Sequence, residues 1–172
     1  MLPKADIVHD RFHIKKHLND AVNQVRRQEH KERTAQGDKC LRGKRSLFLR
    51  NPDDWSEQEA LSFEELCAMQ LRVTRAWELK ELYEDLYSYR SEAWARQFFQ
   101  RWFFRATHSH LRPIVKVAWM LKEHLENIVT YVKHRITNAV AEGLNSKIQA
   151  MKSAAHGFRN FANYRIAILF HY

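Results

Sequence analysis

The sequence of 172 residues has few of the residues that interrupt or cross-link a chain. Its four glycines and three prolines exclude a collagen-like, linker-like or low-complexity protein. A mean hydropathy of −0.61, with no long apolar run, excludes a membrane span. Cys40 and Cys67 form no CxxC motif, and residues 1–4 lead into no apolar signal segment. We therefore expect a reducing, cytoplasmic setting and no membrane partner.

Hydrophobic residues make up 45% of the chain and aromatic residues 12%, which is enough for an apolar core. A chain of this length buries about 70% of its unfolded surface when it folds alone. The composition therefore predicts one compact domain, or part of a larger one.

The charge of the chain is basic and unevenly distributed. Lys and Arg number 29 against 20 Asp and Glu, which gives a net charge of +9 and a pI near 9.7. Residues 1–50 hold 13 basic and 6 acidic side chains, residues 51–100 hold 5 and 11, and residues 101–172 hold 11 and 3. Such an excess favours a polyanionic partner, nucleic acid first, although a basic solvated surface is the alternative interpretation.

Apolar periodicity predicts a mainly α fold. The β-branched run at residues 5–9 is the one strand signal. Helices are expected over residues 13–36, 56–69, 71–89, from 91 through the aromatic stripe, 113–132, 136–153 and from 157 onward. Residues 26–33 are expected to be solvated, and residues 41–50 to form a basic connector.

Local signals place several helix ends. Gly37 is suited to follow the first helix, and Pro113 to occupy the first turn of a later one. Ser56 with Glu59 predicts a capping box, and Ser91 predicts another N-cap. The aromatic stripe at residues 94–104 is interpreted as core, with base stacking as the alternative.

Glu142 is the only acidic residue after Glu126, although basic residues surround it in the sequence. On a helix it shares one polar face with Asn138, Asn145 and Gln149. The adjacent Gly143 costs about 1 kcal/mol in a helix interior, which suggests that a backbone or a nucleic-acid strand passes close to it. An ordinary exposed ion pair between Glu142 and a nearby cation is the simpler alternative.

A second cluster follows the predicted strand, where Asp10 and His13 are flanked by His9 and His17. Asp10 is suited to cap the next helix and hold His13 on its first turn. The three histidines suggest a zinc enzyme as a further hypothesis, but zinc needs three or four ligands and neither cysteine is suitably spaced.

These segments resemble bacterial insertion-sequence DDE transposases of the ISL-three type. The resemblance covers the whole chain, including residues 5–14 and 19–27 near the start and residues 137–149 and 155–161 near the end. Its most specific part is the block that begins with Glu142 and ends with Asn145. Asp10 and His13 match the family's DxxH element, which follows the second catalytic aspartate.

The resemblance implies an RNase H-like catalytic domain with a large helical insertion. Residues 1–13 would be a remnant of that core, residues 14–130 the insertion, and residues 131–172 the C-terminal helices that carry the catalytic glutamate. Glu142 would then be a Mg²⁺ ligand for phosphoryl transfer, with Asp10 as the alternative second acid. Lys147, Lys152 and Arg159 are candidates for DNA contacts because of their charge and proximity.

The sequence differs from the family pattern because the first catalytic aspartate and most of the sheet are missing. We therefore expect a truncated transposase fragment that is inactive alone, with transposon-end and target DNA as partners and a homo-oligomer as an additional partner. The alternative is a helical DNA-binding or interaction module without catalysis, which uses the basic segments 26–50 and 133–165 on phosphates.

Overall fold

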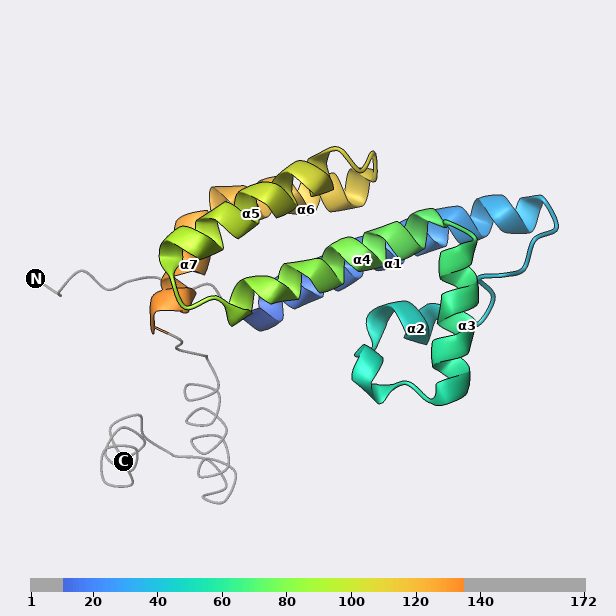
Figure 1. Ribbon diagram of the computed structural model, residues 1–172. Helices are drawn as coiled ribbons and strands as arrows, with labels where there is room; N and C mark the ends of the chain where they lie inside the picture. The colour runs from blue at the N-terminus through green and yellow to red at the C-terminus, as the bar shows by residue number, and fades with distance from the viewer. Residues whose placement is uncertain (1–10, 135–172) are drawn as a thin grey trace, which may run out of the picture. The chain divides into compact units, whose positions relative to one another are not determined.

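The computed structural model describes residues 11–134, and this part of the chain consists of helices joined by short turns (Figure 1). The elements are α1 (Arg11–Ala35), α2 (Arg45–Leu49), η1 (Pro52–Asp54), α3 (Glu57–Ala68), α4 (Arg72–Glu84), η2 (Asp85–Ser88), α5 (Glu92–Thr107), α6 (Arg112–Glu123) and α7 (Leu125–His134). No strand occurs within residues 11–134. The predicted strand at 5–9 and the helices predicted after residue 135 lie outside the described residues.

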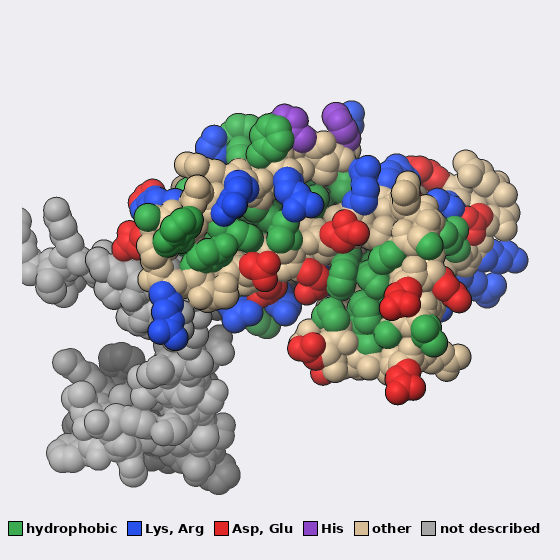
Figure 2. All heavy atoms as spheres, in the orientation of Figure 1, with side chains coloured by type: hydrophobic (Ala, Val, Ile, Leu, Met, Phe, Trp, Pro, Cys, Tyr) green, Lys and Arg blue, Asp and Glu red, His purple; other side chains and the backbone are tan. Residues whose placement is uncertain are grey.

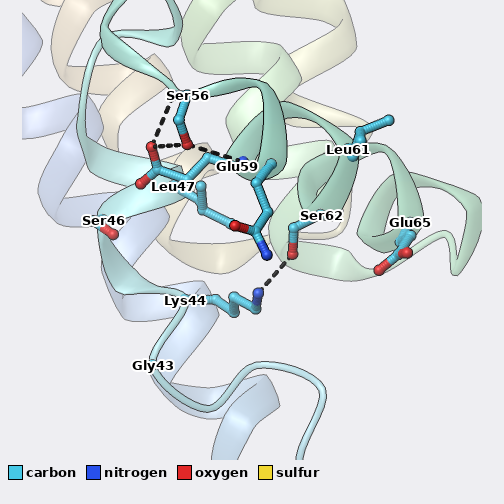
Figure 3. A pocket seen from close by; sticks show the side chains of 10 residues that line it. Gly43, Lys44, Ser46, Leu47, Ser56, Glu59, Leu61, Ser62 and Glu65 are labelled. Atoms are coloured by element: carbon cyan, nitrogen blue, oxygen red, sulfur yellow. Dashed lines mark hydrogen bonds between the residues drawn. The ribbon is translucent and has the colours of Figure 1, made fainter.

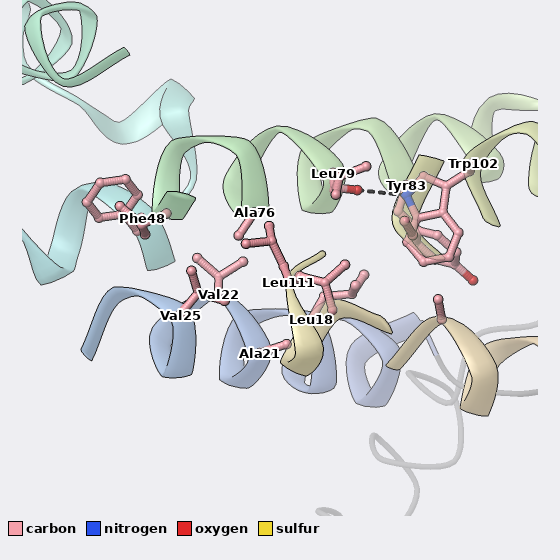
Figure 4. Packing of buried hydrophobic residues seen from close by; sticks show 14 of the residues in the cluster. Leu18, Ala21, Val22, Val25, Phe48, Ala76, Leu79, Tyr83, Trp102 and Leu111 are labelled. Atoms are coloured by element: carbon pink, nitrogen blue, oxygen red, sulfur yellow. Dashed lines mark hydrogen bonds between the residues drawn. The ribbon is translucent and has the colours of Figure 1, made fainter. Parts of the chain in front are cut away.

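The body of this region is the antiparallel pair α1 and α4, which lie side by side (Figure 1). Side chains at intervals of three and four residues on α1 are buried against α4, α2 and α6, and Figure 4 shows several of them facing α4. The buried apolar residues of α1 are Ile14, Leu18, Ala21, Val22 and Val25. This is the spacing of one helix face, so the sequence pattern and the packing agree.

The hairpin of α5 and α6 packs beside this pair, and α7 packs against α5 and α6. Trp102 connects the two layers because it is fully buried and donates a hydrogen bond from Nε1 to the carbonyl of Leu79 at 2.8 Å (Figure 4). Its ring also meets Tyr83 edge-on, with centroids 4.8 Å apart. Burial raises the pKa of Tyr83 well above its usual value.

The segment between α1 and α4 packs against the N-terminal half of α4 through aromatic side chains. Phe63 of α3 lies 4.5 Å from Trp77 and 4.7 Å from Trp55 between ring centroids, and Phe48 of α2 joins the group. The expected basic connector at 41–50 therefore contains a short helix, α2, which Leu47 and Phe48 anchor in the core.

Most predicted helices are confirmed, with two corrections to their extent. The helix predicted over 71–89 ends at Glu84 and continues as the 3₁₀ turn η2. The helix predicted over 113–132 is interrupted at His124, which separates α6 from α7. Gly37 follows α1 with a positive φ of 84°, as a glycine after a helix commonly does.

Two predictions about exposure are partly wrong. Phe98, Phe99 and Trp102 of the aromatic stripe are core residues, but Trp94 and Phe104 are exposed on the other side of α5. Within the predicted solvated stretch 26–33, Glu29 is buried. Cys40 and Cys67 are free, half-buried and packed against the core. No helix in the described part of the chain is long and apolar enough to cross a membrane.

The two predicted serine caps differ, which gives a matched test. Ser56 and Glu59 form the full capping box of α3, whereas Ser91 precedes α5 without a capping hydrogen bond from its side chain. We expect Ser56→Ala to lower the free energy of unfolding by about 1 kcal/mol. Ser91→Ala should change it by less than about 0.5 kcal/mol. Urea unfolding followed by circular dichroism measures both, and equal losses would contradict the assignment.

Candidate functional site

The structure describes one member of the predicted catalytic cluster. His13 lies on the first turn of α1, exposed, with its ring edge-on to Phe12 at 6.0 Å between centroids. Asp10 and Glu142 lie outside the described residues. The same holds for the predicted DNA contacts Lys147, Lys152 and Arg159. Their proximity to one another remains a prediction from the sequence.

Residues 11–134 contain no group of three or more His, Cys, Asp or Glu side chains that could hold a metal ion. His13 and His17 are both exposed on α1, and the third histidine of the zinc hypothesis, His9, is outside the described range. The described helices therefore supply no metal centre of their own.

Glu29 joins α1 to the first turn of α4. Its side chain is 4% exposed and accepts hydrogen bonds from the backbone N–H groups of Arg72 at 3.0 Å and Val73 at 2.8 Å. Leu71 precedes α4 and has no side chain that can cap it, so a carboxylate 43 residues away in sequence does so. Arg33 and Arg72 partly balance the buried charge, at 3.6 and 3.8 Å from Oε1.

Lys80 connects α4 to the C-terminal end of α2. Its side chain is 2% exposed, and Nζ donates to the carbonyl of Phe48 at 3.0 Å, near the end of α2. A cation there complements the carbonyls that a helix end leaves unpaired. Burial lowers the pKa of Lys80, and Glu81, 2.7 Å away, opposes that shift.

We expect Lys80→Ala to lower the free energy of unfolding by about 2 kcal/mol, because it leaves the buried carbonyl of Phe48 without its charged donor. Lys80→Met keeps most of the apolar stem and should cost less. Chemical unfolding of both variants gives the comparison. A methionine variant that is as stable as the wild type would show that the ammonium is not the important group.

The start of α1 is fixed to the end of α4 by ion pairs. Arg11 donates to Oε2 of Glu84 from Nε at 3.1 Å and from Nη2 at 2.6 Å, and Lys15 lies 3.7 Å from the same carboxylate. The guanidinium of Arg11 also lies over the ring of Tyr87 at 4.7 Å. The first residue after Asp10 is therefore held against the helical body.

The last described helix, α7, is held near the start of α5 by an ion pair. Glu126 of α7 accepts a hydrogen bond from Arg96 near the start of α5 at 2.8 Å, and this pairing lowers the pKa of Glu126. The end of α4 leads through η2 directly into the start of α5. The beginning of α1 and α7 therefore approach the same end of the helical body, and Figure 1 shows both on one side.

A polar depression near α2 and α3 is not a convincing catalytic site. It has a volume of about 470 Å³, and its polar side chains pair with one another (Figure 3). Lys44 donates to Oγ of Ser62 at 2.6 Å, and Glu59 accepts from the backbone of Ser56. This hydrogen bond lowers the pKa of Glu59. The groups that line the depression are thus used in holding α3 in place.

The sequence interpretation favoured a core position for the aromatic stripe, with base stacking as the alternative, and did not identify a basic and aromatic surface on α5 and α6. Phe104 and Trp119 are exposed there, and Arg101, Arg105 and Lys122 are exposed on the same two helices. The sequence does contain one signal for this surface, because no Asp or Glu occurs between residues 97 and 122. Figure 2 shows blue, purple and green side chains gathered over these two helices along the upper edge of the view.

Two comparisons with known proteins agree with each other. The chain is 29% identical over 163 residues to a protein named the transposase for insertion sequence element IS1001, from Bordetella parapertussis, and the match covers 92% of this chain and 40% of that protein. It is 28% identical over 120 residues to the transposase for insertion sequence element IS1557 from Mycobacterium tuberculosis, covering 70% of this chain and 27% of that protein. The chain thus spans less than half the length of these curated relatives.

The search of solved structures found no significant match. The family described as "Transposase", of the ISL-three DDE type, matches residues 1–168, which is nearly the whole chain. This range includes both the helical body and the block around Glu142, so the match does not rest on composition alone. The chain belongs to the ISL-three type of DDE transposases.

Proposed function

We propose that this chain supplies the helical insertion and the last metal-binding carboxylate of a DNA transposase that cuts and joins DNA ends. The observation that carries the proposal is the path of the helical body. Arg11 and Glu126, close to the two ends of the described region, are each fixed near the junction of α4 and α5. A segment inserted into a catalytic core must leave and re-enter that core at neighbouring points.

The donor chemistry of Glu142 suits magnesium, because Mg²⁺ prefers a few carboxylate oxygens and keeps several waters. A pair of such ions would activate the attacking oxygen and stabilise the leaving one in phosphoryl transfer. Residues 11–134 provide no competing cluster. Glu142 therefore acts as one metal ligand, and the other acids come from outside the helical body, with Asp10 as one candidate.

The other predicted site residues have a positioning role in this proposal. Lys147, Lys152 and Arg159 neutralise DNA phosphates, while Asp10 and His13 hold the strand end that enters α1. Each phosphate contact adds about 0.9 to the slope of log affinity against log salt for duplex DNA. Binding of the element's terminal repeats should therefore weaken steeply as salt is added.

The test is excision and joining of a marked DNA segment flanked by the terminal inverted repeats of the element at the gene's own locus, with the N-terminal part of the transposase supplied in trans. We expect movement that requires this gene and a divalent metal, with purified chain binding the repeats in a salt-dependent manner. Salt-independent binding and movement unaffected by deletion of the gene would contradict the proposal. Binding with no metal-dependent cutting under any condition would favour the helical DNA-binding module without catalysis.

A further inference from the structure

The hairpin of α5 and α6 has a charge distribution unlike the rest of the described helices. Between Gln97 and Lys122 the chain has no Asp or Glu, but it has five cations, Arg101, Arg105, Arg112, Lys116 and Lys122, all exposed. Several cations elsewhere pair with carboxylates, as Arg11 does with Glu84 and Arg96 with Glu126. Within residues 11–134, none of the five has a carboxylate partner.

The exposed side chains of each helix share one face. On α5, Arg101, Phe104, Arg105 and His108 lie at steps of three, one and three residues, which places them within one exposed stripe. On α6, Arg112, Lys116 and Trp119 follow at steps of four and three. The two helices pack against each other, and Trp119 and Lys122 of α6 contact Phe103 of α5.

Two aromatic rings project from this surface. Phe104 is 61% exposed and Trp119 is 50% exposed. Trp119 meets the half-buried Phe103 edge-on at 5.1 Å, and Nζ of Lys122 lies 4.8 Å from both rings. These contacts fix the position of Trp119 at the seam of the hairpin without covering it. Exposed aromatic rings on a surface that also has unpaired cations are typical of a site that binds another molecule.

A depression of about 420 Å³ at the turn of the hairpin extends the same surface. It is lined by Thr107, His110, Arg112, Val115 and Lys116. His110 holds the turn with a positive φ of 59°, a conformation that is uncommon for residues other than glycine. The residues that line the depression include two cations, Arg112 and Lys116, and no acid.

We propose that the exposed face of the α5–α6 hairpin binds a DNA strand with unpaired bases. The five cations contact its phosphates, and Phe104 and Trp119 stack on its bases. Charge complementarity selects a polyanion, and the two exposed rings select bases whose faces are open, because paired and stacked bases offer none. The inference deepens the proposed function by giving the helical insertion its own DNA contact, separate from the segment that carries Glu142.

Fluorescence anisotropy of the full chain with a labelled single strand of about 16 nucleotides tests the cations. The variant Arg101→Gln/Arg105→Gln/Lys122→Gln should bind more weakly. Its slope of log affinity against log salt should fall by about 2, since each single-strand phosphate contact contributes about 0.7. Arg90→Gln is the matched control, because Arg90 is exposed just before α5 but outside the acid-free stretch.

Phe104→Ala and Trp119→Ala test the rings. Each should lower single-strand affinity by at least about 5-fold, the lower end of the effect of one base stacked on one ring. Affinity for the corresponding duplex should stay unchanged. Leu61→Ala removes an equally exposed apolar side chain from α3 and should change neither. Circular dichroism and thermal unfolding verify that each variant remains folded.

Three results would overturn the inference. The first is unchanged single-strand affinity and salt slope in the triple variant. The second is an equal loss for duplex and single strand, or no loss, in the ring variants. The third is dissociation of an oligomer by Trp119→Ala, seen in sedimentation without an effect on DNA, which would assign the surface to a second copy of the chain. Loss of transposition on Glu142→Gln alongside any of these results would leave the proposed function intact.

Discussion

With the N-terminal part of the transposase supplied in trans, we expect Glu142→Gln to abolish DNA cutting and joining while leaving DNA binding nearly unchanged. Glutamine has almost the same shape as glutamate but no charge, so it is a poor ligand for a hard divalent cation. Loss of one preorganised group that stabilises transition-state charge costs about 100- to 1000-fold in rate. We therefore expect at least that loss in the frequency at which the marked segment moves. Affinity for the terminal repeats should not fall, because the change removes a negative charge next to DNA.

Two controls separate this role from an ordinary ion pair. Glu123→Gln removes an exposed carboxylate from the end of α6 and should leave movement of the segment unchanged. Glu142→Asp retains the charge and should keep part of the activity. If Glu142 only pairs with a neighbour such as Lys147, both Glu142 variants will move the segment normally and lose less than about 1 kcal/mol of stability. That outcome would contradict the metal-ligand proposal.

Helix positions in this chain were predictable because the signals for each helix lie within it or at its ends. The spacing of Leu18, Val22 and Val25 defines one buried face of α1, and the capping box of Ser56 defines where α3 begins. Pro113 lies in the first turn of α6, where its missing N–H has no cost. Such signals depend on residues only a few positions apart, so they survive without any knowledge of the tertiary structure.

The contacts that join the helices were not predictable in the same way. Glu29 lies in a run of charged residues that reads as solvated, and its partners are backbone groups 43 and 44 residues later. Lys80 likewise has no local pattern that distinguishes it from an exposed lysine. Periodicity gives the buried face of a helix but does not show which polar residue another helix end needs.

The candidate site was likewise only partly predictable from the sequence. The stripe from Trp94 to Phe104 is dense enough that it cannot fit on one side of a helix, so some of its rings had to face solvent. Sequence density indicated core, whereas the absence of acids around Phe104 indicated a binding surface. Glu142 and Asp10 lie outside the described residues, so their roles rest on the sequence and on the family to which the chain belongs.

Glu29→Ala should be among the most destabilising single substitutions in the described helices. It removes the acceptor for two backbone N–H groups at the start of α4, and the N–H of Val73 is buried. It also leaves Arg33 and Arg72 without their nearest shared carboxylate. Buried hydrogen bonds to a charged group and a helix cap together suggest a loss of about 3 kcal/mol. Because α4 packs on α1 and α5, the whole helical body should unfold at lower denaturant concentration.

Glu32→Ala is the matched control because Glu32 lies three residues later on α1 and also pairs with Arg72, but is exposed. Its loss should stay below about 1 kcal/mol. Glu29→Gln should fall between the two, since its amide oxygen can accept one hydrogen bond while its amide nitrogen faces the other donor. Urea unfolding of the three variants gives the ranking. Equal midpoints for Glu29→Ala and Glu32→Ala would show that α4 begins without the carboxylate of α1, and that burial of Glu29 follows from packing alone.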